Sequence, residues 1–290
     1  MTDTNPALDD VAISSLRRWF KMTVAYDGTN YSGWQVQPGR ITIQSMLEKA
    51  IALVCRERVR VTGSGRTDSG VHAIGQVASF SLQSWKASAL DLCRALNSKL
   101  PSDIAISEIT DAVEDFHAIR DALGKRYRYQ IQIGGIRDAF EFRYRWHVQG
   151  PIDVEAMREA ATLLLGKHDF ASFQAVGADR KSTVRTVRDL VIIEQKNPRE
   201  LAPGIINNAA SDNVGQGRGA SHLGQHIAIE IEADGFLYNM VRNIVGTLIE
   251  VGRRKHPIGW VQQVLEANDR KQAGPTAPPH GLCLLHVHYE

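Results

Sequence analysis

Hydrophobic residues recur at the spacings of strands and helices along most of this chain. Residues 1–18 lack such a pattern and are expected to form a loose extension. The stretch from Trp19 to Tyr26 predicts a strand, and apolar residues at three- and four-residue steps from Ile43 to Val54 predict a helix with Thr42 as its N-cap. We expect further strands at 59–62, 77–82 and 104–109 and a helix at 87–100, which together make a first half spanning residues 19–110.

A similar order of elements returns in residues 111–290. Apolar and polar residues alternate from Tyr127 to Ile133, the period-two pattern of a half-buried strand. A helix capped by Asp153 and ending at Gly166 follows, and a second helix is expected from Leu237 to Ile249. Further strands are expected at 184–194, 226–232 and 284–289. We therefore predict an α+β fold of two related halves, each an antiparallel sheet with helices on one face.

One long segment interrupts the second half. Residues 196–224 are rich in Asn and Gly and poor in apolar residues, and strands are expected on both sides of them. Such a composition predicts a flexible insertion at the surface. Contact with a partner is the alternative role for this segment.

The composition is that of a globular protein of about two domains, with 290 residues, 43% of them hydrophobic and 23% charged. Disordered and fibrous architectures are therefore excluded. Apolar runs extend over only a few residues, far fewer than the ~18 that a membrane-spanning helix needs. The first residues include Asp3, Asp9 and Asp10 but no Lys or Arg, which is the wrong charge for a targeting peptide. A cytoplasmic protein without a membrane segment is expected.

Neither cysteines nor histidines predict a metal site. His222 and His226 have a helix-like spacing but lie on both sides of Gly224, and His286 and His288 have no acidic neighbours. The three cysteines are far apart and lack the Cys-x-x-Cys spacing, so buried free thiols are expected at Cys55, Cys93 and Cys283.

The net charge of +2 does not by itself predict a partner, but the basic residues fall in short groups. If these groups converge on one face, they form a surface that binds a polyanion. Solvated faces of strands and helices are the alternative. The groups are Arg17, Arg18 and Lys21; Arg56, Arg58 and Arg60; Lys125, Arg126 and Arg128; Arg143 and Arg145; Arg180, Lys181, Arg185 and Arg188; and Arg253, Arg254 and Lys255.

The stretch from Gly63 to His72 is the richest in candidate chemistry. Its glycines bend the backbone between two expected strands and present Arg66, Thr67 and Asp68 at the bend. It is not a phosphate-binding loop, because Val71 stands where that motif requires Lys, and a dinucleotide motif would need Gly at the position of Asp68. An Asp among glycines is also a common turn residue, so a structural role stays open.

The loop from Gly65 to Ala73 resembles the signature loop of the TruA-type tRNA pseudouridine synthases. Five further blocks resemble that family in the expected order, and the resemblance spans about residues 20–290. The blocks are Tyr26-Asp27-Gly28 with Tyr31-Ser32-Gly33-Trp34-Gln35, Phe116-His117-Ala118, Lys125-Arg126-Tyr127-Arg128-Tyr129, Met240-Val241-Arg242-Asn243-Ile244-Val245-Gly246, and the stretch from Ala273-Gly274 to Gly281-Leu282.

The resemblance implies a pseudouridine synthase fold, with its halves joined around a central cleft, and a set of site residues. Asp68 corresponds to the catalytic carboxylate, and Arg66 to an arginine that fills the stack left by the flipped uridine. Tyr127 corresponds to a tyrosine packed on the target base, although its position fits a core residue equally well. Arg242 could pair with Asp68 or lie outward in solvent. The reaction involves no redox change, so no cofactor is expected, and no metal.

The resemblance also implies a tRNA substrate, modification in the anticodon stem and loop (tRNA positions 38 to 40), and a homodimer. Two positions depart from the family pattern: Ile119 follows the Phe-His-Ala block where Arg is usual, with Arg120 one place later, and Ser69 replaces Ala. Two other functions stay open. One is a non-catalytic RNA-binding protein on the same scaffold, and the other is a nucleoside N-glycosidase with Asp68 as its nucleophile.

Overall fold

The computed structural model describes residues 17–175, 177, 182–195 and 224–290, so nearly all of the expected extension at 1–18 and of the insertion at 196–224 lies outside the described residues. The first part of the chain forms β1 (Arg18–Tyr26), α1 (Ile43–Cys55), β2 (Thr62–Gly63), β3 (His72–Leu82), α2 (Ala89–Asn97) and β4 (Ile104–Ala112). The second part forms β5 (Gly124–Ile133), β6 (Trp146–Val148), α3 (Val154–Thr162), β7 (Gly166–Asp169), β8 (Val184–Gln195), β9 (Gln225–Ala233), α4 (Met240–Gly252), α5 (Trp260–Ala267) and β10 (Leu282–His288).

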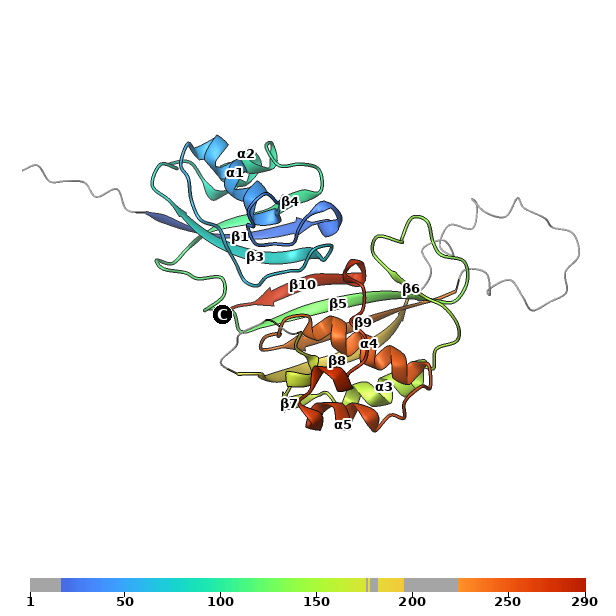
Figure 1. Cartoon of the computed structure of the whole chain (residues 1–290). Coiled ribbons are helices and arrows are strands. Elements are labelled where there is room, and N and C mark those ends of the chain that lie inside the picture. The colour runs from blue at the N-terminus through green and yellow to red at the C-terminus, as the bar shows by residue number, and fades with distance from the viewer. Residues whose placement is uncertain (1–16, 176, 178–181, 196–223) are drawn as a thin grey trace, which may run out of the picture.

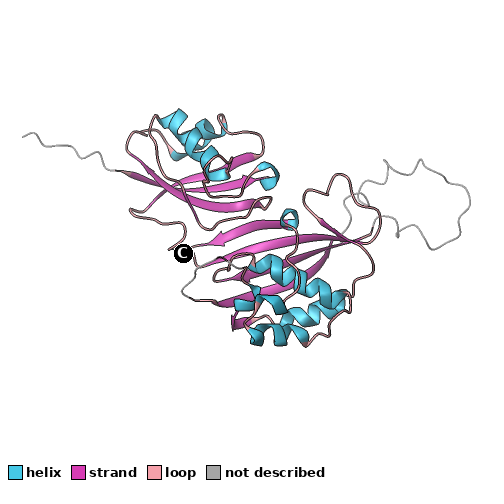
Figure 2. Ribbon diagram, in the orientation of Figure 1, coloured by secondary structure: helices cyan, strands magenta, loops and turns pink. Residues whose placement is uncertain are grey.

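The strands form one sheet in the order β4-β1-β3-β10-β5-β9-β8-β7, with β2 beside β3 and β6 beside β5. Helices α1 and α2 cover the strands of the first half, and α3, α4 and α5 cover those of the second (Figures 1 and 2). The two halves meet where β10 pairs in parallel with β3, Cys283 opposite His72 and Leu284 opposite Ala73. The predicted α+β pseudouridine synthase fold is confirmed, and its two antiparallel sets of strands are joined into a single sheet. The division of the chain at residue 110 stays a prediction.

Local sequence signals account for many of the elements. Thr42 caps α1 through a reciprocal pair of hydrogen bonds with Ser45, and Asp153 caps α3 by accepting from the backbone N–H of Ala156. Both caps were predicted. Alternate residues of β1 are fully buried, as a sheet covered on one face by helices requires. The helices of the described chain include none long and apolar enough to cross a membrane.

The prediction of a strand at 59–62 is wrong, because only Thr62 and Gly63 pair with β3. Side chains of α1 bind the backbone there instead. The Glu48 carboxylate accepts from Val61 N at 3.0 Å, and Gln44 Nε2 donates to the Val61 carbonyl at 2.9 Å. These bonds satisfy a backbone segment that has no neighbouring strand.

Candidate active site

The glycine-rich loop between β2 and β3 is held in place by the segment that precedes α1. Trp34 N donates to the Thr67 carbonyl at 3.0 Å. Gly33 adopts a φ of +82°, and a Cβ at this position would lie 2.6 Å from the same carbonyl oxygen. Within the loop, Val71 N donates to the Asp68 carbonyl at 3.1 Å. The backbone around Asp68 is therefore fixed by contacts that leave no room for a side chain at Gly33.

A buried polar network supports the same loop from β3. Gln76 is fully buried; its Nε2 donates to the Gly65 carbonyl at 3.0 Å, and its Oε1 accepts from Ser64 Oγ at 2.7 Å. The Tyr26 hydroxyl and Thr67 Oγ1 are 2.8 Å apart. Sequence reasoning missed Gln76 and Ser64. The signal that points to Gln76 is a long amide within a strand of mostly small and apolar residues, since buried polar groups need partners.

Asp68 pairs with Arg242 on α4. Arg242 Nη1 donates to Asp68 Oδ2 at 3.1 Å, and the two side chains are 15% and 26% exposed, respectively. Two more acceptors fix the guanidinium: Asn239 Oδ1 and the Ala277 carbonyl, each at 2.8 Å. Of the two orientations open for Arg242, the inward one is found in the structure. It brings together residues from the two halves of the sheet.

Two opposing effects set the acidity of Asp68. Burial raises the pKa of its carboxyl above the ordinary value, and the Arg242 guanidinium opposes that rise through its charge and its hydrogen bond. Without Arg242 the carboxylate would be a partly buried anion with no counter-ion. The ion pair therefore favours the ionised form, which is the form able to attack carbon or accept a proton.

Tyr127 lies on β5 with its ring packed edge-on against Phe236, at a centroid distance of 5.1 Å. The side chain is buried, yet its hydroxyl makes no hydrogen bond to any residue in the described part of the chain. Burial is the main cause that raises the pKa of Tyr127, and Tyr26 and Asp68 add to the effect. The phenol stays protonated at neutral pH, so its hydroxyl can donate a hydrogen bond near Asp68.

Arg66, two residues before Asp68, is exposed. It makes no ion pair with any of the residues that the structure describes. The loop therefore presents one partly buried anion and one solvated cation two positions apart. A guanidinium in this state is available to an incoming ligand, whereas Arg242 is already committed to Asp68.

Two arginines of the basic group on β5 do not form a free basic surface, contrary to one of the two sequence interpretations. Arg126 binds Asp189, Glu230 and Glu232 at 2.6–3.1 Å, and Arg128 binds Glu230. The register of β5 and β9 places Arg126 opposite Glu232 and Arg128 opposite Glu230. Cross-strand pairs of opposite charge thus neutralise these arginines on the sheet face opposite Tyr127.

The departure after the Phe-His-Ala block also has a structural outcome. Ile119 is 55% exposed, and Arg120 donates to Asp121 at 2.8 Å and to Asp115 at 3.2 Å. Arg120 is therefore engaged by two carboxylates, one adjacent in sequence and one five positions earlier. It does not present an uncommitted guanidinium.

The described residues include no group of three His, Cys, Asp or Glu side chains that could hold a metal ion. His222 lies outside the described residues, His226 is buried, and the rings of His286 and His288 are 4.5 Å apart. All three cysteines are free thiols, with Cys283 partly exposed.

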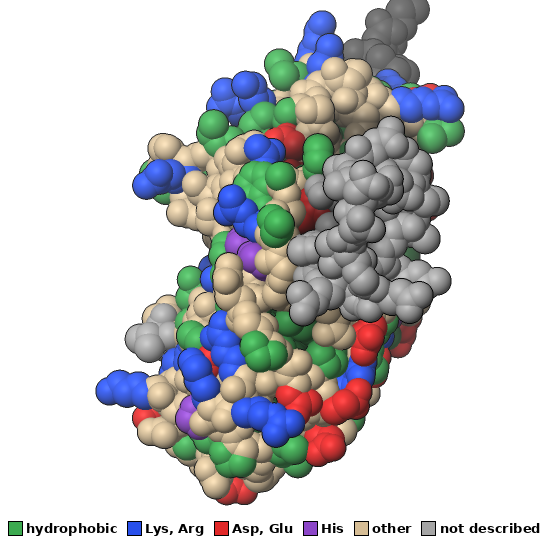
Figure 3. Space-filling view, turned by 90° about the vertical axis from the view of Figure 1, so that its right-hand side faces the viewer, with side chains coloured by type: hydrophobic (Ala, Val, Ile, Leu, Met, Phe, Trp, Pro, Cys, Tyr) green, Lys and Arg blue, Asp and Glu red, His purple; other side chains and the backbone are tan. Residues whose placement is uncertain are grey.

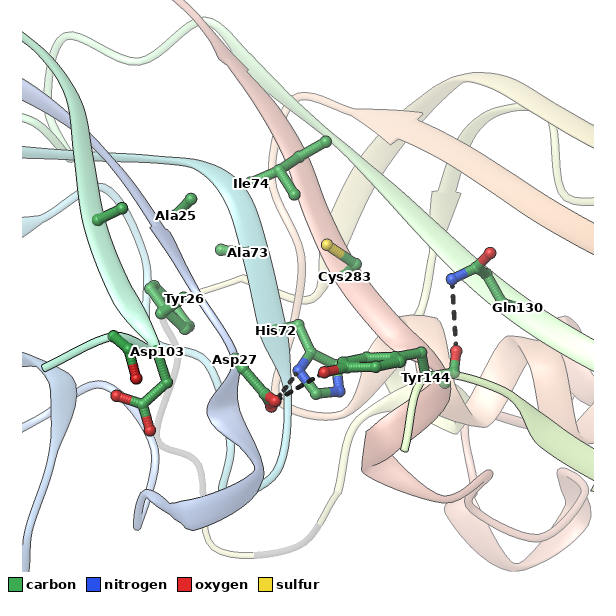
Figure 4. Close-up of a pocket in the computed structure, with 13 residues that line it drawn as sticks. Ala25, Tyr26, Asp27, His72, Ala73, Ile74, Asp103, Gln130, Tyr144 and Cys283 are labelled. Carbon is green, nitrogen blue, oxygen red and sulfur yellow. Dashed lines mark hydrogen bonds and ion pairs between the residues drawn. The ribbon is translucent and has the colours of Figure 1, made fainter. Parts of the chain in front are cut away.

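A cavity of about 380 Å³ is lined in part by Gln130 of β5. Gln130 is three positions after Tyr127 on this strand, so the two side chains point to opposite faces of the sheet, and the cavity lies on the face opposite Tyr127. Figure 4 shows Asp27, His72 and Tyr144 meeting in this cavity. Asp27 Oδ1 lies 3.1 Å from Nδ1 of the His72 ring, and Asp27 Oδ2 accepts from the Tyr144 hydroxyl at 2.9 Å. The Tyr144 contact ties the segment after β5 to the first half, and Asp68, Tyr127 and Arg242 are not among the residues that line the cavity.

Comparisons with known proteins agree with this geometry. The family profile described as tRNA pseudouridine synthase matches residues 22–119 and 160–290. The tRNA pseudouridine synthase A of Myxococcus xanthus is 41% identical over 272 residues, covering 93% of this chain and 91% of its own. That of Thermoanaerobacter sp. strain X514 is 43% identical and covers 92% and 98%, and tRNA pseudouridine synthase A 2 of Clostridium perfringens is 43% identical and covers 94% and 100%.

The fold, the loop carboxylate and these matches define an isomerase that modifies RNA. The chain belongs to the tRNA pseudouridine synthase family, and its relatives across nearly the whole length are synthases of the A type. The resemblance in the sequence motifs is thereby confirmed.

Proposed function

We propose that the protein isomerises uridine to pseudouridine in the anticodon stem and loop of tRNA, with Asp68 as the catalytic carboxylate. The observation that carries this proposal is the ion pair between Asp68 and Arg242, which joins the glycine-rich loop of one half to α4 of the other. Tyr127 provides a buried, protonated hydroxyl whose pKa is raised in part by the charge of the same carboxylate.

The reaction breaks the bond between uracil N1 and ribose C1′ and forms a bond between C5 and C1′. Ionised Asp68 serves it either by bonding to C1′ or by removing the proton of C2′, and both routes need the carboxylate form that Arg242 favours. N1 gains a proton and C5 loses one by the end. The Tyr127 hydroxyl orients the detached uracil and takes part in that proton exchange.

Arg66 and Arg242 have different roles in this scheme. Extruding a uridine from its stack costs a few kcal/mol. The planar guanidinium of Arg66 offsets part of that cost by occupying the space that the extruded uridine leaves. Arg242 holds the charge of Asp68. The exposure of Arg66 and the three acceptors around Arg242 support this division.

We also propose that two copies act together as a homodimer in the cytoplasm, one copy holding the stem-loop while the other supplies the cleft. The family resemblance supports this arrangement. Light scattering of the purified protein should give twice the mass of one chain, and a monomer at working concentrations would contradict it. Fractionation of cells that produce the protein should place it with cytoplasmic tRNA.

One assay tests the function. Unmodified tRNA is incubated with the wild-type protein and with Asp68→Asn, and pseudouridine is mapped at each uridine. We expect modification confined to the anticodon stem and loop in the wild type and none in the variant, with tRNA affinity nearly unchanged because an anion contributes little to phosphate binding. Binding without product would favour the non-catalytic RNA-binding protein, and released uracil the N-glycosidase.

A further inference from the structure

A second cavity, of about 480 Å³, adjoins the catalytic loop. Gly70, two residues after Asp68, forms part of its wall, together with Thr29, Trp146 and His280. Gly70 also approaches Pro279, because a Cβ on Gly70 would lie 3.2 Å from the Pro279 ring. The volume is in the ~300–1,000 Å³ range of small-ligand sites. The cavity therefore borders the catalytic loop at Gly70 and extends from there along the segment after β5.

The lining of this cavity is cationic. It includes Arg137, Arg143 and Arg145, and no described Asp or Glu is among the residues that line it. Arg145 is buried and committed, with Nε donating to Glu141 at 2.8 Å and Nη1 to Gln195 at 2.6 Å. Arg137 and Arg143 are exposed, and within the described chain neither makes an ion pair. Two guanidinium groups are thus available to an anion from outside.

An aromatic ring accompanies these cations. Phe142 is 47% exposed, and the Arg143 guanidinium lies 5.6 Å from the centre of its ring. Figure 3 shows Lys, Arg and His side chains beside hydrophobic ones near the middle of the face that carries this segment. Arginine forks fit phosphate oxygens, and exposed aromatic rings stack on bases. The combination suits a nucleotide better than an inorganic anion.

The segment that carries Arg143 is fixed to the catalytic half. The Arg143 carbonyl lies 3.0 Å from His72 Nε2, and His72 is the first residue of β3 after the catalytic loop. The neighbouring Tyr144 donates to Asp27 at 2.9 Å, as Figure 4 shows. The backbone that presents Arg143 is therefore held in a fixed position relative to the loop of Asp68, so an RNA strand bound at Arg143 is also positioned at that loop.

We propose that this cavity binds a nucleotide of the RNA strand next to the target uridine, with Arg137 and Arg143 on its phosphate and Phe142 against its base. The proposal rests on the tRNA pseudouridine synthase function and deepens it by assigning a subsite for the flanking strand. The arginines of β5 have no part in it, because carboxylates already neutralise them.

The test compares Arg137→Gln/Arg143→Gln, which removes two charges, with Arg58→Gln, which removes one charge at an exposed arginine outside the cavity. Binding of the full-length protein to unmodified tRNA is measured across salt concentrations. We expect the double variant to bind at least ten-fold more weakly, with a salt slope reduced by about 0.7–0.9 for each lost phosphate contact. Arg58→Gln should keep the wild-type salt slope. Phe142→Ala should weaken tRNA binding about ten-fold without changing the salt slope.

Single-turnover rates at saturating tRNA separate this proposal from the function itself. The double variant should retain the wild-type melting temperature and still form pseudouridine once tRNA saturates it, whereas a wild-type protein that makes no pseudouridine would refute the function and not the subsite alone. Wild-type affinity and slope in the double variant would overturn the subsite. An equal loss in Arg58→Gln, or a change of oligomeric state with tRNA affinity intact, would also overturn it.

Discussion

At the scale of single residues, the hydroxyl of Tyr127 allows a test of whether this residue only fills the core or also takes part in the reaction. Tyr127→Phe keeps the ring and its contact with Phe236 and removes an oxygen that has no partner among the described residues. Folding stability should therefore change little. If the hydroxyl handles a proton or orients uracil, turnover should slow on the order of 10²-fold. Single-turnover rates and a melting temperature from the same preparation decide between the two, and full activity would return Tyr127 to the core.

Asn239 offers a test of how Arg242 is held. It adopts a φ of +60° at the start of α4, and its side chain accepts from the same Arg242 nitrogen that donates to Asp68. Asn239→Gly tolerates that φ and removes the acceptor. Arg242 then stabilises the Asp68 charge less well, so the carboxyl pKa, already raised by burial, rises further.

The sign of the effect on activity follows from the form that reacts. The ionised carboxylate is needed, so the rate falls as the pH drops through the pKa of Asp68, and a higher pKa moves this acid limb to higher pH. We expect a move of a few tenths to about one pH unit in Asn239→Gly. Asn268→Gly, at another positive φ after α5, is the control and should leave the limb in place. An unmoved limb in Asn239→Gly would remove Asn239 from the site.

At the scale of elements, the catalytic loop depends on the segment before α1. Gly33→Ala places a methyl group 2.6 Å from the Thr67 carbonyl, so the loop must move and carry Asp68 with it. We expect a loss of about 1–3 kcal/mol of stability and at least a ten-fold lower rate. Gly39→Ala is the control, because Gly39 also has a positive φ but nothing within 4 Å. Gly39→Ala should lower stability without lowering the rate. Equal rates in both variants would show that the contact between a methyl group at position 33 and the Thr67 carbonyl does not displace Asp68.

The sequence predicted the elements whose signals are local. The caps at Thr42 and Asp153 match because a cap depends on a few neighbouring residues. The start of β3 at His72 was missed, since most of this strand is buried on both faces and shows no alternation. Helix α5 was not predicted, although Trp260, Val261, Val264 and Leu265 have helical spacing.

The site was predictable only in its local part. The loop motif identified Asp68 and its neighbours, but whether Arg242 turned inward depended on a contact across 174 positions of the sequence. The neutralisation of the β5 arginines also depends on residues distant in sequence, because the register with β9 decides which carboxylates lie opposite them. The register between two strands cannot be predicted from the spacing of residues along one of them.

At the scale of the whole molecule, activity depends on the joint between β3 and β10. A Cβ at Gly75 would lie 2.2 Å from the Leu285 carbonyl, a backbone atom that cannot turn aside. Gly75→Ala should therefore separate the strands, lower the melting temperature and abolish most activity, because Asp68 and Arg242 come from different sides of the joint. Gly259→Ala, with open space around it, should leave both measurements near wild type. Normal activity in Gly75→Ala would show that the joint between β3 and β10 tolerates a methyl group without displacing Asp68 from Arg242.

The position of β10 in the chain has a consequence for how the enzyme is made. It follows every other strand of the described chain in sequence, yet it lies between β3 and β5 in the finished sheet. Until it leaves the ribosome, the nascent chain holds two pieces of sheet, each with an unsatisfied edge, and the strand that connects the half of Asp68 to the half of Arg242 is missing. The protein therefore gains its activity only after β10 has emerged and paired on both sides.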